Sequence, residues 1–257
     1  MTRRLPLDGI ENFRDFGDYA AGERRLKSGL LYRSGHHARA SDSDLQALEK
    51  LGFSVIVDLR RSNEREREPS RRWDAFAAEV IDNDIGQDGI DEWYAFLEAS
   101  DLSPRSFRDY MLDYYEKAPF VARHVDLYRR YFQALAGSEG PVLVHCAAGK
   151  DRTGILCALT HHVAGVADDD IVADYLATND PARFAARADG FRQHIQETTG
   201  RAVSDEAMHV AMGVEPAYLE MAFHVMRDRH GSIDSYLDET LGLDAGVRGR
   251  IHDRLLD

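Results

Sequence analysis

Residues 141–154 read PVLVHCAAGKDRTG, and the rest of the chain is best understood from this stretch outward. Pro141 to Cys146 is a short run of mainly apolar residues, which is typical of a strand buried on both faces of a parallel sheet. Ala147 to Gly149 is a turn of small residues, and Asp151 to Val163 has the composition of a helix. The stretch therefore predicts a buried strand, a tight loop and a helix start.

This arrangement suits the binding of an anion. Backbone N–H groups of a loop of small residues can converge on one anion, and the N-terminus of the following helix adds positive potential. Cys146 would lie at the base of this cradle, where the same field favours the thiolate over the thiol. The residues expected to form the phosphate-binding loop are Ala147, Ala148, Gly149, Lys150 and Arg152.

Two side chains after the loop add to the pattern. Arg152 carries a planar guanidinium that can hold two phosphate oxygens. Thr153 can donate its hydroxyl to the thiolate of Cys146 and so stabilise it as a leaving group. Gly149 permits a backbone geometry and a close approach that a side chain would block.

Strand and helix patterns flank this stretch along the chain. Ser41, with Asp44 at the fourth place of a capping pattern, predicts the start of a helix that ends at Gly52. Residues 53–59 are rich in β-branched apolar residues and predict a strand buried on both faces. Residues 77–81 predict a further strand.

The alternation of strands and helices predicts an α/β fold. We expect a mostly parallel central sheet of about four or five strands, flanked by helices. No internal repeat, linker or composition shift divides the chain, so residues 1–257 are predicted to be a single domain. Within it, residues 86–137 are mainly helical and rich in aromatic residues, and they predict either a helical lid-like insertion or core packing.

Composition excludes several classes of protein. The chain has 257 residues, of which 44% are hydrophobic and 30% charged, as in ordinary soluble domains. A net charge of −13 argues against a nucleic-acid partner. The sequence has no apolar run long enough for a transmembrane helix and no visible secretory signal, so we expect a cytoplasmic protein, with export by a signal-free route left open. The oligomeric state cannot be read from the sequence.

The two cysteines are expected to be free thiols. Cys146 and Cys157 would be separated by about 16 Å along a helix, whereas a disulfide needs Cα atoms within about 7 Å. Free thiols fit a reducing compartment. No metal site is expected, because the adjacent histidines at 36–37 and 161–162 would diverge on a helix.

The stretch resembles the signature of the cysteine-dependent phosphatases, in which His-Cys and five further residues precede Arg and Ser or Thr. The form GKDRTG at residues 149–154 is similar to that of a bacterial family of protein-tyrosine and lipid phosphatases. Further blocks resemble the same family: NFRDFG at 12–17, LYRSG at 31–35, VDLR at 57–60 with Glu64 and Pro69 after it, and the tail from Tyr218 to Leu237.

The resemblance implies a dual-specificity-phosphatase-like fold and hydrolysis of phosphomonoesters without a metal or cofactor. Cys146 would attack phosphorus and form a phosphocysteine intermediate, while Arg152 and the loop amides stabilise the transition state. Water would then hydrolyse the intermediate. The implied substrates are phosphotyrosine in a protein and, for some members, phosphoserine, phosphothreonine or a phosphoinositide.

A general acid must protonate the leaving oxygen. The resemblance favours Asp151, which would have to be protonated beside a phosphate dianion. The alternative role for Asp151 is that of an N-cap for the helix. Asp82 and Asp84, which follow the strand predicted at 77–81, are the rival candidates for the acid.

Four neighbouring residues are expected to support the site. Lys150 suits a contact to extra phosphates on an inositol ring, or it neutralises Asp151 or Asp58. Asp58 and Arg60 end a predicted parallel strand, at the edge of the sheet where ligands collect. Asp58 would therefore orient Lys150 or Arg152, or it simply starts a turn. His145 belongs to the signature as the residue before Cys146.

Two other functions fit less well. A non-catalytic phosphoryl-binding module would lack Cys146 or Arg152, and both are present. A sulfur transferase that carries a cysteine persulfide would have a shorter loop, and the Arg-Thr ending fits it poorly.

Overall fold

A computed structural model describes residues 5–86 and 92–257. Residues 87–91, which are part of the insertion predicted at 86–137, lie outside these ranges. Residues 1–4, which were part of the evidence against a secretory signal, also lie outside them.

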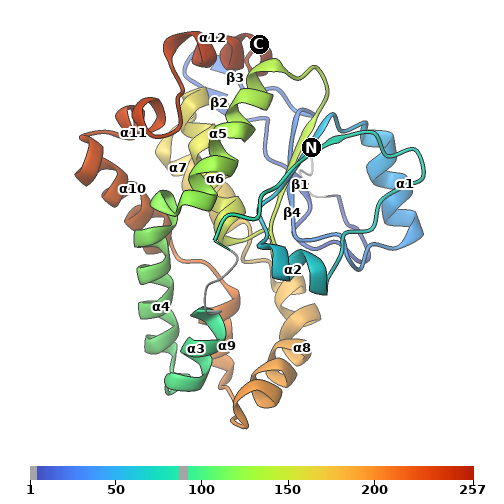
Figure 1. Cartoon of the computed structure of the whole chain (residues 1–257), viewed down its shortest axis with the longest axis vertical. Helices are drawn as coiled ribbons and strands as arrows, with labels where there is room; N and C mark the ends of the chain where they lie inside the picture. The colour runs from blue at the N-terminus through green and yellow to red at the C-terminus, as the bar shows by residue number, and fades with distance from the viewer. Residues whose placement is uncertain (1–4, 87–91) are drawn as a thin grey trace.

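A five-stranded sheet forms the centre of the described chain (Figure 1). Its strand order is β1-β4-β7-β5-β6, and every neighbouring pair is parallel except β1 and β4. The predicted α/β class with a mostly parallel sheet is therefore confirmed. β2 and β3 form a separate antiparallel pair. The strands are β1 (Arg14–Asp15), β2 (Ala20–Ala21), β3 (Arg24–Arg25), β4 (Leu31–Ser34), β5 (Val55–Asp58), β6 (Glu79–Ile81) and β7 (Val142–His145).

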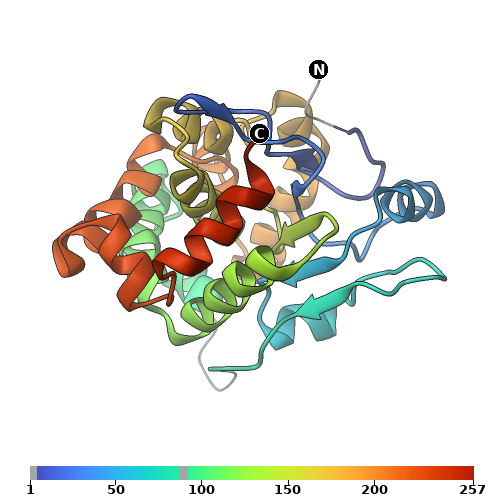
Figure 2. The same ribbon diagram turned by 90° about the horizontal axis from the view of Figure 1, so that it is seen from above.

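Helices cover both faces of the sheet (Figures 1 and 2). The described helices are α1 (Asp42–Leu51), α2 (Ser62–Arg67), α3 (Glu92–Ala99), α4 (Pro104–Lys117), the short 3-10 helix η1 (Ala118–Phe120), α5 (Ala122–Gly137), α6 (Asp151–Ala164), α7 (Asp168–Leu176), α8 (Pro181–Thr199), α9 (Asp205–Met212), α10 (Pro216–His230), α11 (Ile233–Glu239) and α12 (Ala245–Leu255).

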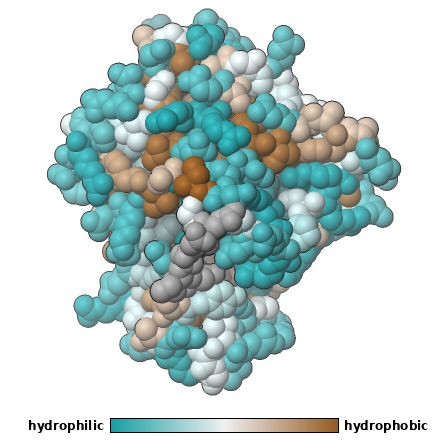
Figure 3. Space-filling model, viewed as in Figure 1, coloured by the Kyte–Doolittle hydropathy of each residue, from teal (hydrophilic) through white to brown (hydrophobic). Residues whose placement is uncertain are grey.

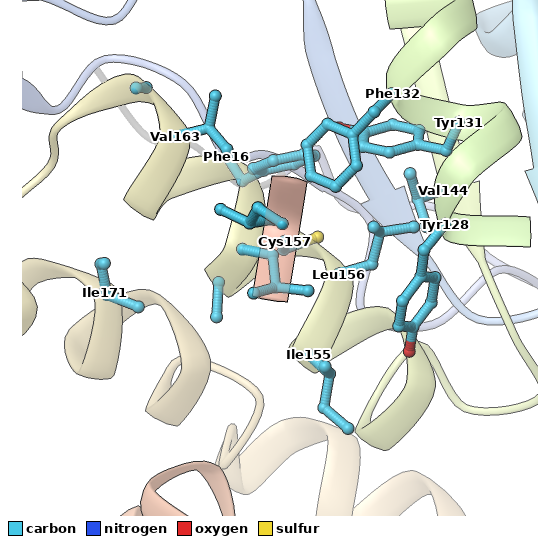
Figure 4. Packing of buried hydrophobic residues seen from close by; sticks show 14 of the residues in the cluster. Phe16, Tyr128, Tyr131, Phe132, Val144, Ile155, Leu156, Cys157, Val163 and Ile171 are labelled. Carbon is cyan, nitrogen blue, oxygen red and sulfur yellow. The ribbon is translucent and has the colours of Figure 1, made fainter. Parts of the chain in front are cut away.

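The alternation of side chains along the strands divides the core into two parts. Val55 and Val57 on β5 belong to the larger cluster, which includes α5, α6 and α12. Ile56, between them, belongs to a smaller cluster on the other face, where Leu45 and Leu48 of α1 pack. Figure 4 shows the larger cluster around Cys157 of α6. Since both faces are covered, the central strands β5 and β7 are apolar up to their last residues, as the sequence pattern predicts.

Helix α1 begins and ends where its capping pattern predicts. The side chain of Ser41 accepts a hydrogen bond from the backbone N–H of Asp44, and Asp44 accepts one from Ser41 in return. Gly52 ends the helix in the left-handed conformation, with φ +66°. Asp44 also accepts the backbone N–H groups of Asp8 and Gly9, so this cap ties the N-terminal segment to the smaller core.

The predicted insertion at 86–137 divides between two parts of the molecule. Helix α5 buries Leu127, Tyr128, Tyr131, Phe132 and Leu135 in the large core, at helical spacing. Helix α3 and Phe107 of α4 instead form a third cluster with α8 and α9, whereas Met111 and Tyr115 of α4 belong to the large core. Figure 1 shows α3, α4, α8 and α9 extending from one end of the sheet. We call these four helices the helical extension.

The register of the sheet brings three polar residues to one edge. Ser34 at the end of β4 and Asp58 at the end of β5 both pair with His145 at the end of β7. Cys146 follows directly, so the candidate nucleophile lies at the carboxyl edge of a parallel sheet, where α/β proteins bind ligands.

Among residues 5–86 and 92–257, no helix is long and apolar enough to cross a membrane. The face in Figure 3 is mostly polar, with apolar residues gathered across its middle.

Candidate active site

Cys146 occupies the turn between strand β7 and helix α6, and it is 2% exposed. The next four residues form the loop, and α6 begins at Asp151. Among the described residues, no group accepts a hydrogen bond from the backbone N–H of Ala147, Ala148, Gly149 or Lys150. Those four donors surround the start of a helix, which is the arrangement that binds anions.

Gly149 is required by the geometry of this loop. Its φ of +62° is left-handed, and a Cβ there would lie 2.3 Å from the carbonyl oxygen of Ser34. The segment after β4 presses on the loop at a second point, since the backbone N–H of His36 donates to the carbonyl of Ala147 over 3.0 Å. The end of the LYRSG block at residues 31–35, and the residue after it, therefore pack directly against the loop.

The carbonyl of Gly149 faces away from the loop's N–H groups and is held by two side chains. Asn12 Nδ2 donates to it over 2.7 Å and Arg33 Nη2 over 3.0 Å. Asn12 itself has a left-handed backbone, with φ +57°. The N-terminal NFRDFG block thus contributes directly to the shape of the loop, a role that its position in the sequence does not reveal.

A buried ionic cluster supports these two side chains. Asp174 on α7 pairs with Arg14 Nε at 3.2 Å and with Arg33 Nη1 at 2.7 Å, and the three side chains are at most 3% exposed. Burial alone would raise the pKa of Asp174, but the two guanidinium groups outweigh it and hold the pKa well below its ordinary value. Asp174 was not among the residues that the sequence singled out.

Arg152 is oriented by a carboxylate on α2. Glu64 accepts from Arg152 Nη1 at 2.5 Å and from Nη2 at 2.8 Å, and the carbonyl of Leu59 accepts from Nη1 at 3.1 Å. A guanidinium has five N–H groups, so the edge formed by Nε and the second Nη2 hydrogen stays available in the described structure. That edge matches the two-oxygen contact expected for a phosphate.

The pairing with Arg152 changes the titration of Glu64. Burial alone would raise the pKa of Glu64, but Arg152 outweighs it and lowers the pKa to about 2. A second cation lies near, because Arg123 Nη2 donates to the same Leu59 carbonyl over 2.6 Å. The Nε and Nη1 groups of Arg123 are buried without a hydrogen-bond partner in the described part of the chain. This side of the site therefore carries an excess of positive charge.

Lys150 and Asp151 lie side by side, and each has a further partner. Lys150 Nζ donates to the carbonyl of Ala211 on α9 over 2.7 Å and lies 3.6 Å from Asp151 Oδ2. Burial lowers the pKa of Lys150, and the neighbouring carboxylate opposes that effect. The other oxygen of Asp151 accepts a hydrogen bond from the hydroxyl of Tyr115 over 2.9 Å.

The alternative role of Asp151 as an N-cap is wrong. Asp151 is the first residue of α6, and Lys150 occupies the cap position without a side-chain cap. An N-cap carboxylate must precede the first helical residue to reach the free N–H groups. Asp151 starts one residue too late, so its carboxylate is directed to Tyr115 and Lys150 instead.

Asp58 does not orient Lys150 or Arg152, which corrects the prediction. Both of its oxygens bind Arg60, at 2.9 Å from Nε and 2.7 Å from Nη2, since the residue after next on an extended chain end can fold back upon it. His145 Nε2 lies 3.6 Å from Asp58 and its ring stacks on His37 at 4.7 Å. Burial lowers the pKa of His145 to about 4, so the ring is neutral near pH 7.

Thr153 does not form the predicted hydrogen bond to Cys146. Its hydroxyl is buried and has no hydrogen-bond partner among the described residues. Asp82 and Asp84, the rival acids, follow β6 and both pair with Arg65, Asp82 at 3.6 Å. Cys157 is a free, buried thiol, as is Cys146, and burial raises the pKa of Cys157 to about 12.

No group of three or more His, Cys, Asp or Glu side chains in residues 5–86 and 92–257 is arranged to hold a metal ion.

The chain is similar in sequence to known proteins over most of its length. The sequence profile of a tyrosine phosphatase family matches residues 5–257. A Cupriavidus necator protein assigned to the tyrosine-protein phosphatases is 34% identical over 95% of this chain and 87% of its own length. The triple specificity protein phosphatase PtpB of Mycobacterium tuberculosis is 31% identical over 99% of both chains. A solved structure of P. aeruginosa TpbA superposes with a TM-score of 0.34 and 18% identity, over 76% of this chain and 96% of that one.

Replacing Asp174 with Asn tests the ionic cluster. The variant leaves Arg14 and Arg33 buried without their counter-charge, so we expect the free energy of unfolding in urea to fall by about 3 kcal/mol or more. Asp113→Asn is the control, because that carboxylate is 55% exposed and its one ion pair among the described residues is with Lys117 within α4. We expect it to cost less than about 0.5 kcal/mol. Similar losses in the two variants would show that the cluster does not stabilise the fold.

The pair between Glu64 and Arg152 predicts a pH dependence of stability. Because the pKa of Glu64 is depressed from 4.5 to about 2, the pair stabilises the fold above pH 4.5, and this contribution is lost as the pH falls towards 2. The full contribution is about 3 kcal/mol. The free energy of unfolding of Glu64→Gln should therefore fall less steeply over this range than that of the wild type. The control is Glu220→Gln, at an exposed carboxylate that pairs with Arg227, and its free energy of unfolding should follow the wild-type dependence on pH. If Glu64→Gln also follows the wild-type dependence, the pair between Glu64 and Arg152 contributes nothing to stability.

Proposed function

The chain belongs to the tyrosine phosphatase family and is a phosphoric monoester hydrolase, and from this premise we propose that Cys146 is its nucleophile and that phosphotyrosine in proteins is its main substrate. The observation that carries the proposal is the set of free backbone N–H groups at residues 147–150, with Cys146 before them and the free edge of Arg152 after them. These groups supply the donors that three equatorial phosphoryl oxygens need.

The proposed reaction has two steps. In the first, Cys146 Sγ forms a bond to phosphorus while the bond from phosphorus to the leaving oxygen breaks, and Asp151 gives its proton to that oxygen. In the second, a water oxygen bonds to phosphorus and the S–P bond breaks. Asp151 takes the water's proton, so the enzyme returns to its starting state and inorganic phosphate leaves.

Two features favour a protein substrate over a lipid substrate. The amine of Lys150 is 7% exposed and already donates to Ala211, so it is not free to meet a ring phosphate unless α9 moves. Arg183 and Arg187, the next cations, both pair with Glu11. The name of the M. tuberculosis relative denotes three specificities, which supports activity on phosphoserine or phosphothreonine as well.

A phosphoinositide phosphatase is the second candidate. It is favoured by the number of cations beside the loop, since Arg183 and Arg187 lie close enough to Lys150 to contribute to the lowering of its pKa, after the larger effect of burial. A lipid headgroup with several phosphates would compete with Glu11 and Asp151 for these cations.

We also propose that the helical extension, not the whole of residues 86–137, acts as the lid of a single catalytic domain. Its α9 touches the loop through the bond from Lys150 to Ala211, and its α4 touches Asp151 through Tyr115. Helix α5, in contrast, packs in the large core, and among the described residues it adds no side chain to the cluster that α3, α4, α8 and α9 share. A cover over the site would limit the access of water and oxidants to Cys146.

Phosphate release from three substrates tests the proposed chemistry and specificity. We expect a phosphotyrosine peptide to be hydrolysed faster than a phosphoserine peptide, and both faster than a short-chain phosphatidylinositol monophosphate. Cys146→Ser should show no turnover and should still bind inorganic phosphate, because the loop donors remain. Cys157→Ser is the matched control and should keep turnover, since its thiol is buried in the core. Turnover by Cys146→Ser would disprove the mechanism, and a faster reaction with the lipid would assign the enzyme to lipid substrates.

The role of Asp151 predicts a dependence on the leaving group. Asp151→Asn cannot donate a proton, so phenyl phosphate, with a poor leaving group, should be hydrolysed about 100-fold more slowly than by the wild type. p-Nitrophenyl phosphate has a good leaving group and should lose less than about tenfold. Asp82→Asn and Asp84→Asn are the controls and should change neither rate. Equal losses on the two substrates would place the acid elsewhere.

A further inference from the structure

We propose that Tyr115, supported by Tyr175, is a positioning residue that holds one oxygen of Asp151 so that the other oxygen delivers the proton to the leaving group. The inference rests on the proposed function, in which Asp151 is the general acid. It assigns a role to two tyrosines from helices α4 and α7, which are remote from the loop in sequence.

The three groups form a continuous hydrogen-bonded chain. The hydroxyl of Tyr115 lies 2.9 Å from Asp151 Oδ1 and 2.7 Å from the hydroxyl of Tyr175. Tyr115 is 0% exposed and Tyr175 is 1% exposed, whereas the Asp151 side chain is 22% exposed. The chain therefore runs from the protein interior to a carboxyl group that substrate can reach.

Counting protons gives the chain a direction. Each phenol has one hydrogen, and an ionised carboxylate can only accept. Tyr115 must therefore donate to Asp151, and Tyr175 must donate to Tyr115. Among the described residues, Tyr175 has no other hydrogen-bond partner for its hydroxyl, so reversing the chain would leave a buried hydrogen unsatisfied.

This direction selects the oxygen of Asp151 that can carry a proton. A proton on Oδ1 would face the hydrogen that Tyr115 already presents there. Oδ2 accepts no hydrogen bond within 3.5 Å from a described residue, and the amine of Lys150 lies 3.6 Å from it and already donates to Ala211. Protonated Asp151 thus keeps the bond from Tyr115 on Oδ1 and has its acidic hydrogen on Oδ2.

The packing fixes both rings. The Tyr115 ring lies 5.7 Å from that of Tyr218, inclined at 31°. The Tyr175 ring packs on Gly154 of α6 so closely that a Cβ there would lie 2.9 Å from it. Burial raises the pKa of both hydroxyls well above the ordinary value, so they remain donors at neutral pH and do not themselves supply the proton.

The test compares Tyr115→Phe with the wild type on phenyl phosphate and p-nitrophenyl phosphate. Phenylalanine keeps the ring and removes only the hydroxyl. If Tyr115 positions the acid, kcat on phenyl phosphate should fall about tenfold and kcat on p-nitrophenyl phosphate less than about threefold. Tyr175→Phe should show the same pattern with a smaller loss, because Tyr115 still donates to Asp151.

Tyr131→Phe is the matched control. Its hydroxyl is also buried and hydrogen-bonded, to Thr160 over 2.9 Å, but it lies on α5 and in the core. Losing that bond should destabilise the protein without changing the ratio of the two rates. If Tyr115→Phe changes the two rates equally, or no more than Tyr131→Phe does, the positioning role is wrong.

Combining Tyr115→Phe with Asp151→Asn distinguishes a failure of the positioning role of Tyr115 from a failure of the acid role of Asp151. A residue that acts only through the acid should cost less than about twofold in a background that has no acid. A further tenfold loss there would overturn the inference while leaving Asp151 as the acid. If Asp151→Asn alone shows no dependence on the leaving group, the acid assignment of the proposed function fails instead.

Discussion

The hydrogen bonds to the carbonyl of Gly149 are the interaction on which the rest of the site depends. A loop can direct its N–H groups to one point only if its carbonyls face the other way, and a buried carbonyl needs donors. Asn12 and Arg33 provide them. Because Arg33 is buried, it needs a counter-charge, and Asp174 supplies it for Arg33 and Arg14 together. The anion cradle, the N-terminal block and α7 are thus parts of one structure.

The charges around the loop show how a protein with a negative net charge can have a cationic site. Around the loop most cations have a carboxylate partner: Arg60 has Asp58, Arg152 has Glu64 and Lys150 has Asp151. Within the described part of the chain, the guanidinium of Arg123 has one hydrogen-bond partner, the carbonyl of Leu59. The net charge of −13 is distributed over the whole chain. An excess of one or two positive charges at the loop is a local property, and it is compatible with a negative total.

The backbone of the site could be predicted because its determinants are local. The apolar run before Cys146, the small loop and the helix start follow from neighbouring residues, and so does the cap at Ser41. The side-chain partners could not be predicted in this way. Asp174 is one of 45 acidic residues, and only the folded position of α7 beside α6 identifies it as the partner of Arg33. Tyr115 reaches the loop only because the helical extension folds over it. The expected contact from Thr153 to Cys146 failed for the same reason, since side-chain geometry on the first turn of a helix is set by what packs around it.

The general acid that we propose, Asp151, lies next to the phosphate-binding loop, and this position creates a conflict that the structure has to resolve. Asp151 is the first residue of α6, so its carboxylate lies in the same helix N-terminal field that attracts phosphate, and unrestrained it would compete for the loop's N–H groups. Tyr115 holds one oxygen and Lys150 lies beside the other, which keeps the carboxylate at the rim of the site. On the proposed mechanism, the six positions from Cys146 to Asp151 carry nucleophile, cradle and acid on one short segment, and the cradle stays free for the phosphoryl group.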